Sequence, residues 1–305
     1  MKSRKLYVIG NGFDLWHNIP SSLAQFKQYV HALDRDTFRE IENYLPTQDN
    51  WSDLEWALGD MDVDALIDDL AHFMSSYGAE DWSDAGHYDF QYEVTNVIEH
   101  LSTGLQQNFS KWIRKLPIPT PATAEMRFTT LDTDAVFFSF NYTNTLGSLY
   151  GVPPEKILFI HGCADRADDD LVLGHAWHPQ TRKSLNDRPD IEDIDMRLME
   201  VNNIIDNYFF ETFKRSADLI AQYRGFFEAL TDIEQVIVLG HSLSDVDAAY
   251  FTALLKQRSV AEAAWLIACR SLEEWPQKES LLTKLGVNAT RATPITWGSG
   301  LPLIS

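Results

Sequence analysis

Cysteine is scarce in this chain of 305 residues, which contains only Cys163 and Cys269. Two cysteines cannot build a disulfide framework, and neither belongs to a Cys-x-x-Cys pair of the kind that binds zinc or carries out redox chemistry. The scarcity excludes a small disulfide-rich module and fits a reducing compartment. We therefore expect a cytoplasmic protein with no metal site built on cysteine.

Long apolar runs are also absent. The basic N-terminus leads directly into the four residues Leu6–Ile9, and Gly10 ends that run. Such a run is far too short for a signal peptide or a membrane span. No other stretch approaches a spanning length, so we expect no membrane contact.

Basic residues are few: 25 Lys and Arg face 45 Asp and Glu, which gives a net charge of −20. Such a field repels phosphate backbones and anionic lipids, so direct nucleic-acid binding is disfavoured. From Glu40 to Ser110 there are 16 acidic residues and no Lys or Arg. This stretch is interpreted either as a solvated outer face or as a surface for a basic partner.

Apolar material is plentiful, with 45% hydrophobic residues, 9 Trp, 11 Tyr and 17 Phe. This composition predicts a globular fold of one large domain or two coupled ones. Short, continuous apolar runs predict buried strands, with helical patterns between them, at Leu6–Ile9, Ala135–Phe138, Ile157–Ile160, Val236–Leu239 and Trp265–Ala268. Continuous rather than alternating runs indicate a mostly parallel, doubly wound α/β sheet of Rossmann type.

More than a hundred residues separate the first two predicted strands. Within them Leu66, Leu70 and Phe73 recur at helical spacing among aspartates. We therefore predict an α/β core from residues 1–22 and 131–305, with an acidic, mainly helical insertion at 23–130. A second helical pattern extends over Met196–Leu230.

In an open parallel sheet, ligands bind beyond the carboxyl ends of the strands. Four polar corners follow predicted strands, and they are the candidate site: Gly10-Asn11-Gly12-Phe13-Asp14, Ser139-Phe140-Asn141-Tyr142-Thr143-Asn144, His161-Gly162-Cys163 and Gly240-His241-Ser242-Leu243-Ser244-Asp245.

The first corner is a Gly-x-Gly turn in which Gly10 and Gly12 let a phosphate approach backbone N–H groups. It lacks the third glycine of the usual dinucleotide motif, so an ordinary tight turn is the alternative. Asp14 is interpreted either as a contact to ribose hydroxyls or as a helix cap.

The second and third corners supply Asn141 and His161. Asn141 offers a donor and an acceptor, which suits positioning a water or a carboxamide, and an Asx turn is the alternative. His161 should stand at the rim of the sheet as a general base, with a structural role as the alternative. Cys163 is interpreted as a small packed residue.

The fourth corner offers Ser242 to a phosphate, while Asp245 or Asp247 caps or enters the following helix. Elsewhere, His175 and His178 have a spacing that can ligate a metal, although a structural or substrate-contacting loop is the favoured interpretation beside Trp177. The chain has neither a Gly-x-Ser-x-Gly elbow nor a Walker phosphate loop.

Taken together, the four corners resemble the AbiH family of bacterial phage abortive-infection proteins over nearly the whole chain. The residues that carry this resemblance are Leu6–Leu15, Phe140–Leu146, Ile160-His161-Gly162 and Leu239–Leu243. More distantly, the corners resemble the sirtuin-type NAD-binding fold, in which Asn141 and His161 match the catalytic asparagine and histidine. The departures are Asp14 for a serine, His241 for a threonine, and the missing four-cysteine zinc module, which argues against deacylation.

The resemblance implies antiviral defence by cleavage of the nicotinamide–ribose bond of NAD, with Asn141 and His161 as catalytic residues and no metal. It also implies NAD contacts from the first, second and fourth corners: Gly10, Asn11, Gly12, Phe13, Asp14, Ser139, Tyr142, Gly240, His241, Ser242 and Asp245. Two alternatives stay open. One is a nucleotide sensor that acts through a protein partner or a homo-oligomer, and the other is a metal-dependent phosphoesterase using His161, His175, His178, Asp245 and Asp247.

Overall fold

The computed structural model describes residues 4–74, 88–297 and 303–304. The chain forms two compact units, each assembled from segments that are far apart in the sequence. The sheet unit comprises Met1–Ser22, Trp112–Val172 and Arg215–Ser305, and the helical unit comprises Leu23–Lys111 and Leu173–Lys214.

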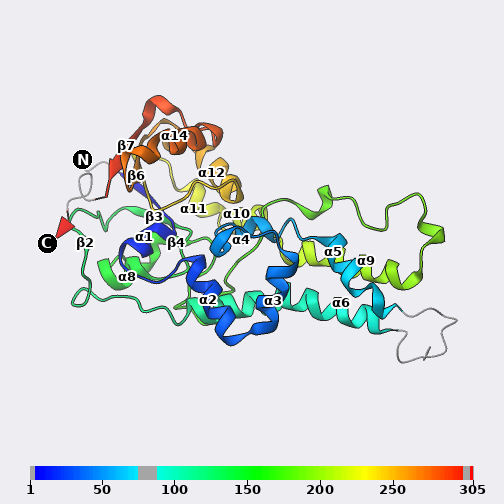
Figure 1. The fold of residues 1–305 in the computed structure, drawn as a ribbon. Helices are drawn as coiled ribbons and strands as arrows, with labels where there is room; N and C mark the ends of the chain where they lie inside the picture. Colours follow the sequence, from blue (N-terminus) through cyan, green and yellow to red (C-terminus); the bar gives the residue numbers. More distant parts are fainter. Residues whose placement is uncertain (1–3, 75–87, 298–302, 305) are drawn as a thin grey trace. The chain divides into compact units, whose positions relative to one another are not determined.

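The sheet unit is built on six parallel strands in the order β4-β3-β1-β5-β6-β7 (Figure 1). This order is consistent with a Rossmann-type arrangement, in which the direction of strand addition reverses beside the first strand. The strands are β1 (Lys5–Ile9), β3 (Val136–Ser139), β4 (Ile157–Phe159), β5 (Gln235–Leu239), β6 (Ala264–Cys269) and β7 (Ala292–Thr296). A separate two-stranded antiparallel sheet joins β2 (Arg127–Phe128) to β8 (Leu303–Ile304).

Helices flank the sheet, because alternate side chains of each strand enter separate apolar cores. Tyr7 and Ile9 of β1 join one core, and Leu6 and Val8 join the other. The first core includes residues of α1 (Asn11–Trp16) and α8 (Thr145–Tyr150). The second is covered by α10 (Ser216–Gln222), α11 (Arg224–Glu228), α12 (Ala248–Leu255), α13 (Arg258–Glu262) and α14 (Trp275–Lys284).

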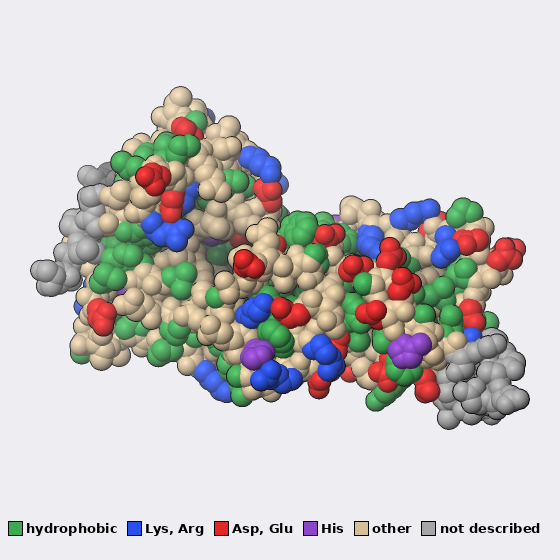
Figure 2. Space-filling model, in the orientation of Figure 1, with side chains coloured by type: hydrophobic (Ala, Val, Ile, Leu, Met, Phe, Trp, Pro, Cys, Tyr) green, Lys and Arg blue, Asp and Glu red, His purple; other side chains and the backbone are tan. Residues whose placement is uncertain are grey.

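The helical unit contains two long helices that lie side by side, α6 (Asp89–Glu99) and α9 (Met196–Glu211). A π-helical turn at His100–Gly104 connects α6 to α7 (Leu105–Ile113), whose last residues belong to the sheet unit. The other helices are α2 (Leu23–Leu33), α3 (Arg35–Tyr44), α4 (Leu54–Ala57) and α5 (Val63–Leu70). On the face drawn in Figure 2, acidic side chains gather over α5 and α9, with some Lys and Arg among them.

The prediction of a mixed α/β fold with a parallel sheet is confirmed, since all five predicted strands are present. Strand β7 was not predicted, because it is an edge strand that is only partly buried and contains Pro294. The helical pattern over Met196–Leu230 is broken into three helices rather than one. No helix among the described residues is long and apolar enough to cross a membrane.

Candidate functional site

The four polar corners lie at one edge of the sheet, because their strands are adjacent and end in register. Ile9 of β1 pairs with Ser139 of β3 on one side and with Leu239 of β5 on the other. Ser139 in turn pairs with Phe159 of β4. The candidate residues from all four corners therefore follow neighbouring strand ends.

The first and fourth corners are in direct backbone contact. The Gly12 N–H donates to the Gly240 carbonyl at 2.8 Å, and the Gly10 N–H donates to the Leu239 carbonyl at 2.9 Å. A Cβ atom on Gly12 would lie 2.8 Å from the Gly240 Cα, and one on Gly10 would lie 2.5 Å from the His241 Cα. The glycines are thus required by the packing of one turn against the other, and both N–H groups are already engaged.

The neighbours of these glycines have mainly structural contacts. Phe13 is fully buried beside His17 and Phe128, so its side chain belongs to the core rather than to a binding surface. Asn11 is exposed, and its amide nitrogen donates to the Ser21 carbonyl at 2.8 Å while its amide oxygen accepts from the Ser21 hydroxyl at 2.6 Å.

Asp14 lies inside α1 and connects the first corner to the second. Its carboxylate accepts hydrogen bonds from the Thr143 hydroxyl and, at 2.7 Å, from the Thr145 hydroxyl. The side chain is 1% exposed, and burial raises the pKa of this carboxyl to about 6, although the hydrogen bonds from Thr143, Thr145 and Asn141 oppose the shift. Gly10 occupies the N-cap position of α1, so Asp14 does not cap this helix.

The second corner holds Asn141 in a buried position. Its backbone N–H donates to the Ser139 hydroxyl at 3.1 Å, and only 6% of the residue is exposed. The amide oxygen Oδ1 is buried and has no hydrogen-bond partner among the residues that the structure describes. Tyr142 donates its hydroxyl to the Val172 carbonyl at 2.7 Å and stacks on His161.

His161 follows β4 as expected but is only 2% exposed, so its imidazole does not stand at an open rim. The Nε2 atom lies 3.2 Å from the Tyr250 hydroxyl. The rings of Phe140 and Tyr142 also pack against the imidazole. His161 is therefore a core-facing residue at the end of its strand.

The fourth corner contains an ion-pair geometry that the sequence did not indicate. His241 accepts the Leu243 N–H at Nδ1 (2.8 Å), and its Nε2 lies 3.3 Å from the Asp247 carboxylate. Both ring nitrogens are thus engaged within the fold. Ser242 is exposed, and so is Asp245, whose carboxylate accepts from the Lys284 ammonium at 2.5 Å.

The two histidines of the predicted loop are held separately within the helical unit. His175 is buried and places Nε2 2.9 Å from the Phe209 carbonyl, whereas exposed His178 accepts the Gln180 N–H at Nδ1. In the described ranges, no three His, Cys, Asp or Glu side chains gather at metal-binding distances.

Sequence reasoning did not identify Thr143, Thr145, Tyr250 or Asp247 as partners of the candidate residues. The two threonines could have been considered, because Thr143 belongs to the same polar corner as Asn141 and Thr145 directly follows that corner. Tyr250 and Asp247 were not, because an ordinary core tyrosine and an ordinary helix cap have the same local pattern. Their contacts become visible only when distant strand ends are placed side by side.

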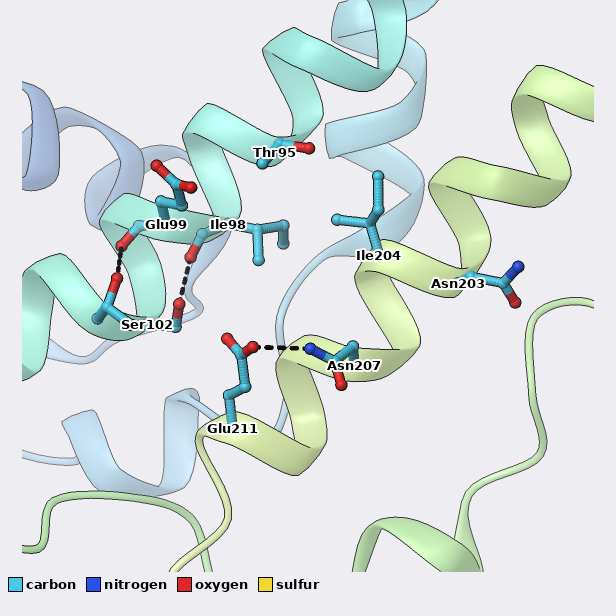
Figure 3. Close-up of a pocket in the computed structure, with 9 residues that line it drawn as sticks. Thr95, Ile98, Glu99, Ser102, Asn203, Ile204, Asn207 and Glu211 are labelled. Atoms are coloured by element: carbon cyan, nitrogen blue, oxygen red, sulfur yellow. Dashed lines mark hydrogen bonds between the residues drawn. The ribbon is translucent and has the colours of Figure 1, made fainter.

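A hollow of about 430 Å³ lies between α6 and α9 of the helical unit (Figure 3). Ile98 and Ile204 line it together with polar groups such as Glu99 and Glu211. The Ser102 hydroxyl on its wall donates to the Ile98 carbonyl one turn earlier, so it is already engaged. None of the residues predicted for the site lines this hollow.

We expect His161→Ala to destabilise the fold by about 2 kcal/mol or more, because it leaves a cavity among buried rings. His161→Gln fills more of that space and should cost less. Urea unfolding of both variants against the parent measures the difference. If His161→Ala unfolds like the parent, the imidazole is not part of the packed core.

The family described as "Bacteriophage abortive infection AbiH" matches residues 6–269 of this chain, which includes all four corners. No curated protein and no solved structure matches the chain. Because the family match covers most of the sequence, the chain belongs to the AbiH family, and its role lies in abortive-infection defence against bacteriophage.

Proposed function

We propose that the chain binds a nucleotide at the carboxyl ends of β4, β3, β1 and β5 and hydrolyses the nicotinamide–ribose bond of NAD or a related nucleotide. The observation that carries the proposal is the buried amide oxygen of Asn141, which follows a strand end and has no hydrogen-bond partner in the described part of the chain. A buried polar atom without a partner is rare and calls for an explanation. The reversal in the order of strand addition between β1 and β5 supports the location, because ligands of such sheets bind at that point.

The reaction needs no strong acid. Nicotinamide is attached as a cationic pyridinium, and it leaves with the electron pair of the glycosidic bond as a neutral ring. The sugar carbon then carries the positive charge of an oxocarbenium ion, until water adds to that carbon and releases a proton. The protein must therefore stabilise a cation, position a water molecule and accept one proton.

The candidate residues can divide these tasks. Asp14 provides a buried negative charge whose pKa, about 6, leaves it mostly ionised at pH 7, and such a charge favours a developing cation. Asn141 would position water or a ribose hydroxyl with its amide oxygen, and His161 would take up the proton. For the pyrophosphate, the exposed Ser242 hydroxyl is the better candidate, since the Gly12 N–H donates to Gly240 and the Asn11 amide is hydrogen-bonded to Ser21.

The test is incubation of the purified protein with NAD, NADP and ADP-ribose, with and without phage lysate and chelator, followed by chromatography of the products. We expect nicotinamide and ADP-ribose from NAD in the presence of chelator. Asn141→Ala should reduce the rate at least about a hundredfold if the residue positions the reacting groups. Asn144→Asp in the same loop is the matched control, because an aspartate can also cap α8.

A nucleotide sensor without turnover is the second candidate. The burial of His161 and the engagement of both His241 nitrogens favour it, because neither imidazole is an exposed base. In the same assay, a sensor would bind NAD or ADP-ribose and release no nicotinamide. Activity that disappears with chelator and returns with a divalent metal would contradict both candidates and favour the phosphoesterase alternative.

A further inference from the structure

The turn after β5 has an unusual backbone. Leu243 has a φ of +62°, in the left-handed region that a bulky residue rarely adopts. Gly240, earlier in the same turn, has a φ of +73°. The Leu243 side chain is fully buried in the core that contains Leu6 and Val8. A leucine keeps such a conformation only where its surroundings hold it there, and residues of this kind gather at ligand-binding sites.

The imidazole of His241 is one of the groups that hold this backbone. Its Nδ1 accepts the Leu243 N–H at 2.8 Å, so the side chain closes the turn as the oxygen of an asparagine or aspartate does in an Asx turn. The residue is 5% exposed, and its ring lies on Phe140 with the ring centroids 4.2 Å apart. The ring of Phe251 packs edge-on against it. The turn is therefore closed by a side chain that has little room to move away.

The same hydrogen bond decides which nitrogen of His241 carries the proton. A neutral imidazole has one donor and one acceptor nitrogen, and a nitrogen that accepts an N–H cannot hold the proton itself. The proton of the neutral ring is therefore on Nε2, which lies 3.3 Å from an Asp247 carboxylate oxygen. Asp247 is 8% exposed, so water screens this attraction little. Asp247 thus favours the tautomer that closes the turn.

The middle residue of the closed turn faces solvent. Ser242 is exposed, whereas His241 and Leu243 on either side of it are buried. Fixing both neighbours fixes the direction of the Ser242 Cα–Cβ bond, so the hydroxyl keeps only the staggered positions about that bond. The turn follows β5 beside β1, where the order of strand addition reverses and ligands of such sheets bind.

We propose that His241 is a positioning residue, which closes the turn through Nδ1 and so presents the Ser242 hydroxyl to a phosphate group of the ligand. Asp247 assists by keeping the ring proton on Nε2. A hydroxyl can donate to a phosphate oxygen, and a hydroxyl whose direction is already restricted loses less conformational freedom on binding. The phosphate part of this inference rests on the proposed function, whereas the closure of the turn concerns the fold alone.

Nuclear magnetic resonance of the full chain, labelled with ¹⁵N at histidine, tests the closure of the turn. At pH 8 the His241 ring should be protonated at Nε2, and the signal that His241→Asn lacks identifies it. Asp247→Asn should keep this tautomer, because an amide oxygen still accepts from Nε2. Asp247→Leu should populate the form protonated at Nδ1 as well. A parent ring protonated at Nδ1 would show that the turn is not closed in this way.

Calorimetric binding of ADP-ribose and inorganic pyrophosphate tests the phosphate part. Ser242→Ala and His241→Gln should each bind both probes about tenfold more weakly. The combined variant should bind no more weakly than Ser242→Ala, because His241 acts through that hydroxyl. His241→Asn should stay within about threefold of the parent, since its Oδ1 can accept the Leu243 N–H. Ser148→Ala, which removes an exposed hydroxyl on α8, is the matched control.

Turnover of NAD gives a readout that a general structural defect would not reproduce. His241→Gln should raise KM about tenfold and change kcat less than about twofold, because the hydroxyl holds a phosphate and not the reacting bond. A loss of folded protein would lower kcat as well.

The outcomes distinguish this inference from the proposed reaction. If the losses in His241→Gln and Ser242→Ala add in the combined variant, His241 does not act through Ser242 and the positioning role is wrong. If the parent binds both probes with the expected coupling but releases no nicotinamide from NAD, the inference stands and the proposed hydrolysis fails. If the parent binds neither probe, the phosphate part and the proposed nucleotide site fail together, and the resonance experiment decides the closure of the turn.

Discussion

Replacing Gly240 with alanine is expected to destabilise the sheet unit by at least about 4 kcal/mol, a range reached only by exceptional substitutions. Gly240 has a φ of +73°, which a residue with a Cβ atom adopts at a cost. Its added Cβ would also lie 2.1 Å from the Phe13 backbone nitrogen and 2.5 Å from the Gly12 carbonyl carbon. Both contacts are with backbone, so neither can be relieved by turning a side chain.

Two other glycines are controls that separate these causes. Gly151 has a φ of +68° with nothing within 4 Å of an added Cβ, so Gly151→Ala measures the backbone cost alone, about 1 kcal/mol. Gly225 lies in α11 with the same open surroundings, and Gly225→Ala should be neutral or slightly stabilising. Urea unfolding of the three variants separates the cost of the positive φ from the cost of the close contact. If Gly240→Ala matched Gly151→Ala, the close contact between the two turns would be refuted.

The strands could be predicted from the sequence because burial on both faces leaves a local signal. Runs such as Leu6–Ile9 have no polar residue to alternate with, and only a covered parallel sheet tolerates this. The polar corners were equally visible, since each follows its run directly. The edge strand β7 was not visible, because it is only partly buried and Pro294 interrupts it, so it has no continuous apolar run.

The chemistry of the corners was harder to predict because it depends on pairs that are far apart in the sequence. Asp14 meets Thr143 across 129 positions, and His161 meets Tyr250 across 89. Gly12 has the sequence signature of a phosphate turn, yet its N–H donates to Gly240. A motif specifies a backbone shape, but whether its N–H groups are free for a ligand depends on the turn that packs against it.

Local sequence patterns also could not show which segments of the chain form the helical unit. Its second segment begins at Leu173, where no change of composition marks a boundary. The segment packs α9 against α6 of the first segment, and isolated polar contacts also join the two, such as the Tyr208 hydroxyl to the Leu58 carbonyl and the buried Lys214 ammonium to the Glu55 carboxylate. Contacts of this kind have no periodicity that a sequence could display.

Two buried histidines predict a loss of stability in acid. His17 donates from Nδ1 to the Phe13 carbonyl at 2.6 Å, and its Nε2 lies 2.7 Å from the Tyr150 hydroxyl. Burial lowers the pKa of His17 to about 4, and it lowers the pKa of His175 in the helical unit equally. Both imidazoles are therefore neutral in the folded protein over a range in which the unfolded chain is protonated.

This difference in proton binding makes the folded protein less stable in acid. Below pH 6.5 the unfolded chain takes up protons that the folded protein refuses, so the free energy of unfolding falls as the pH drops toward 4. The loss is about 3 kcal/mol for each imidazole. Asp14 acts in the opposite direction, because its raised pKa makes the folded protein take up a proton as the pH falls through about 6. Asp14 thus offsets roughly one histidine, and a net loss remains.

We expect urea unfolding at pH 7 and pH 4.5 to show this loss, and His17→Phe to reduce it by about 2 kcal/mol or more. Asp14→Asn should increase the loss of stability at pH 4.5, because the variant lacks the group whose protonation favours the folded state in acid. His72→Gln is the matched control, since it removes an exposed imidazole in place of a buried one. A parent protein that is equally stable at both pH values, together with a His17→Phe variant of the same pH dependence, would show that these imidazoles are not held neutral by burial.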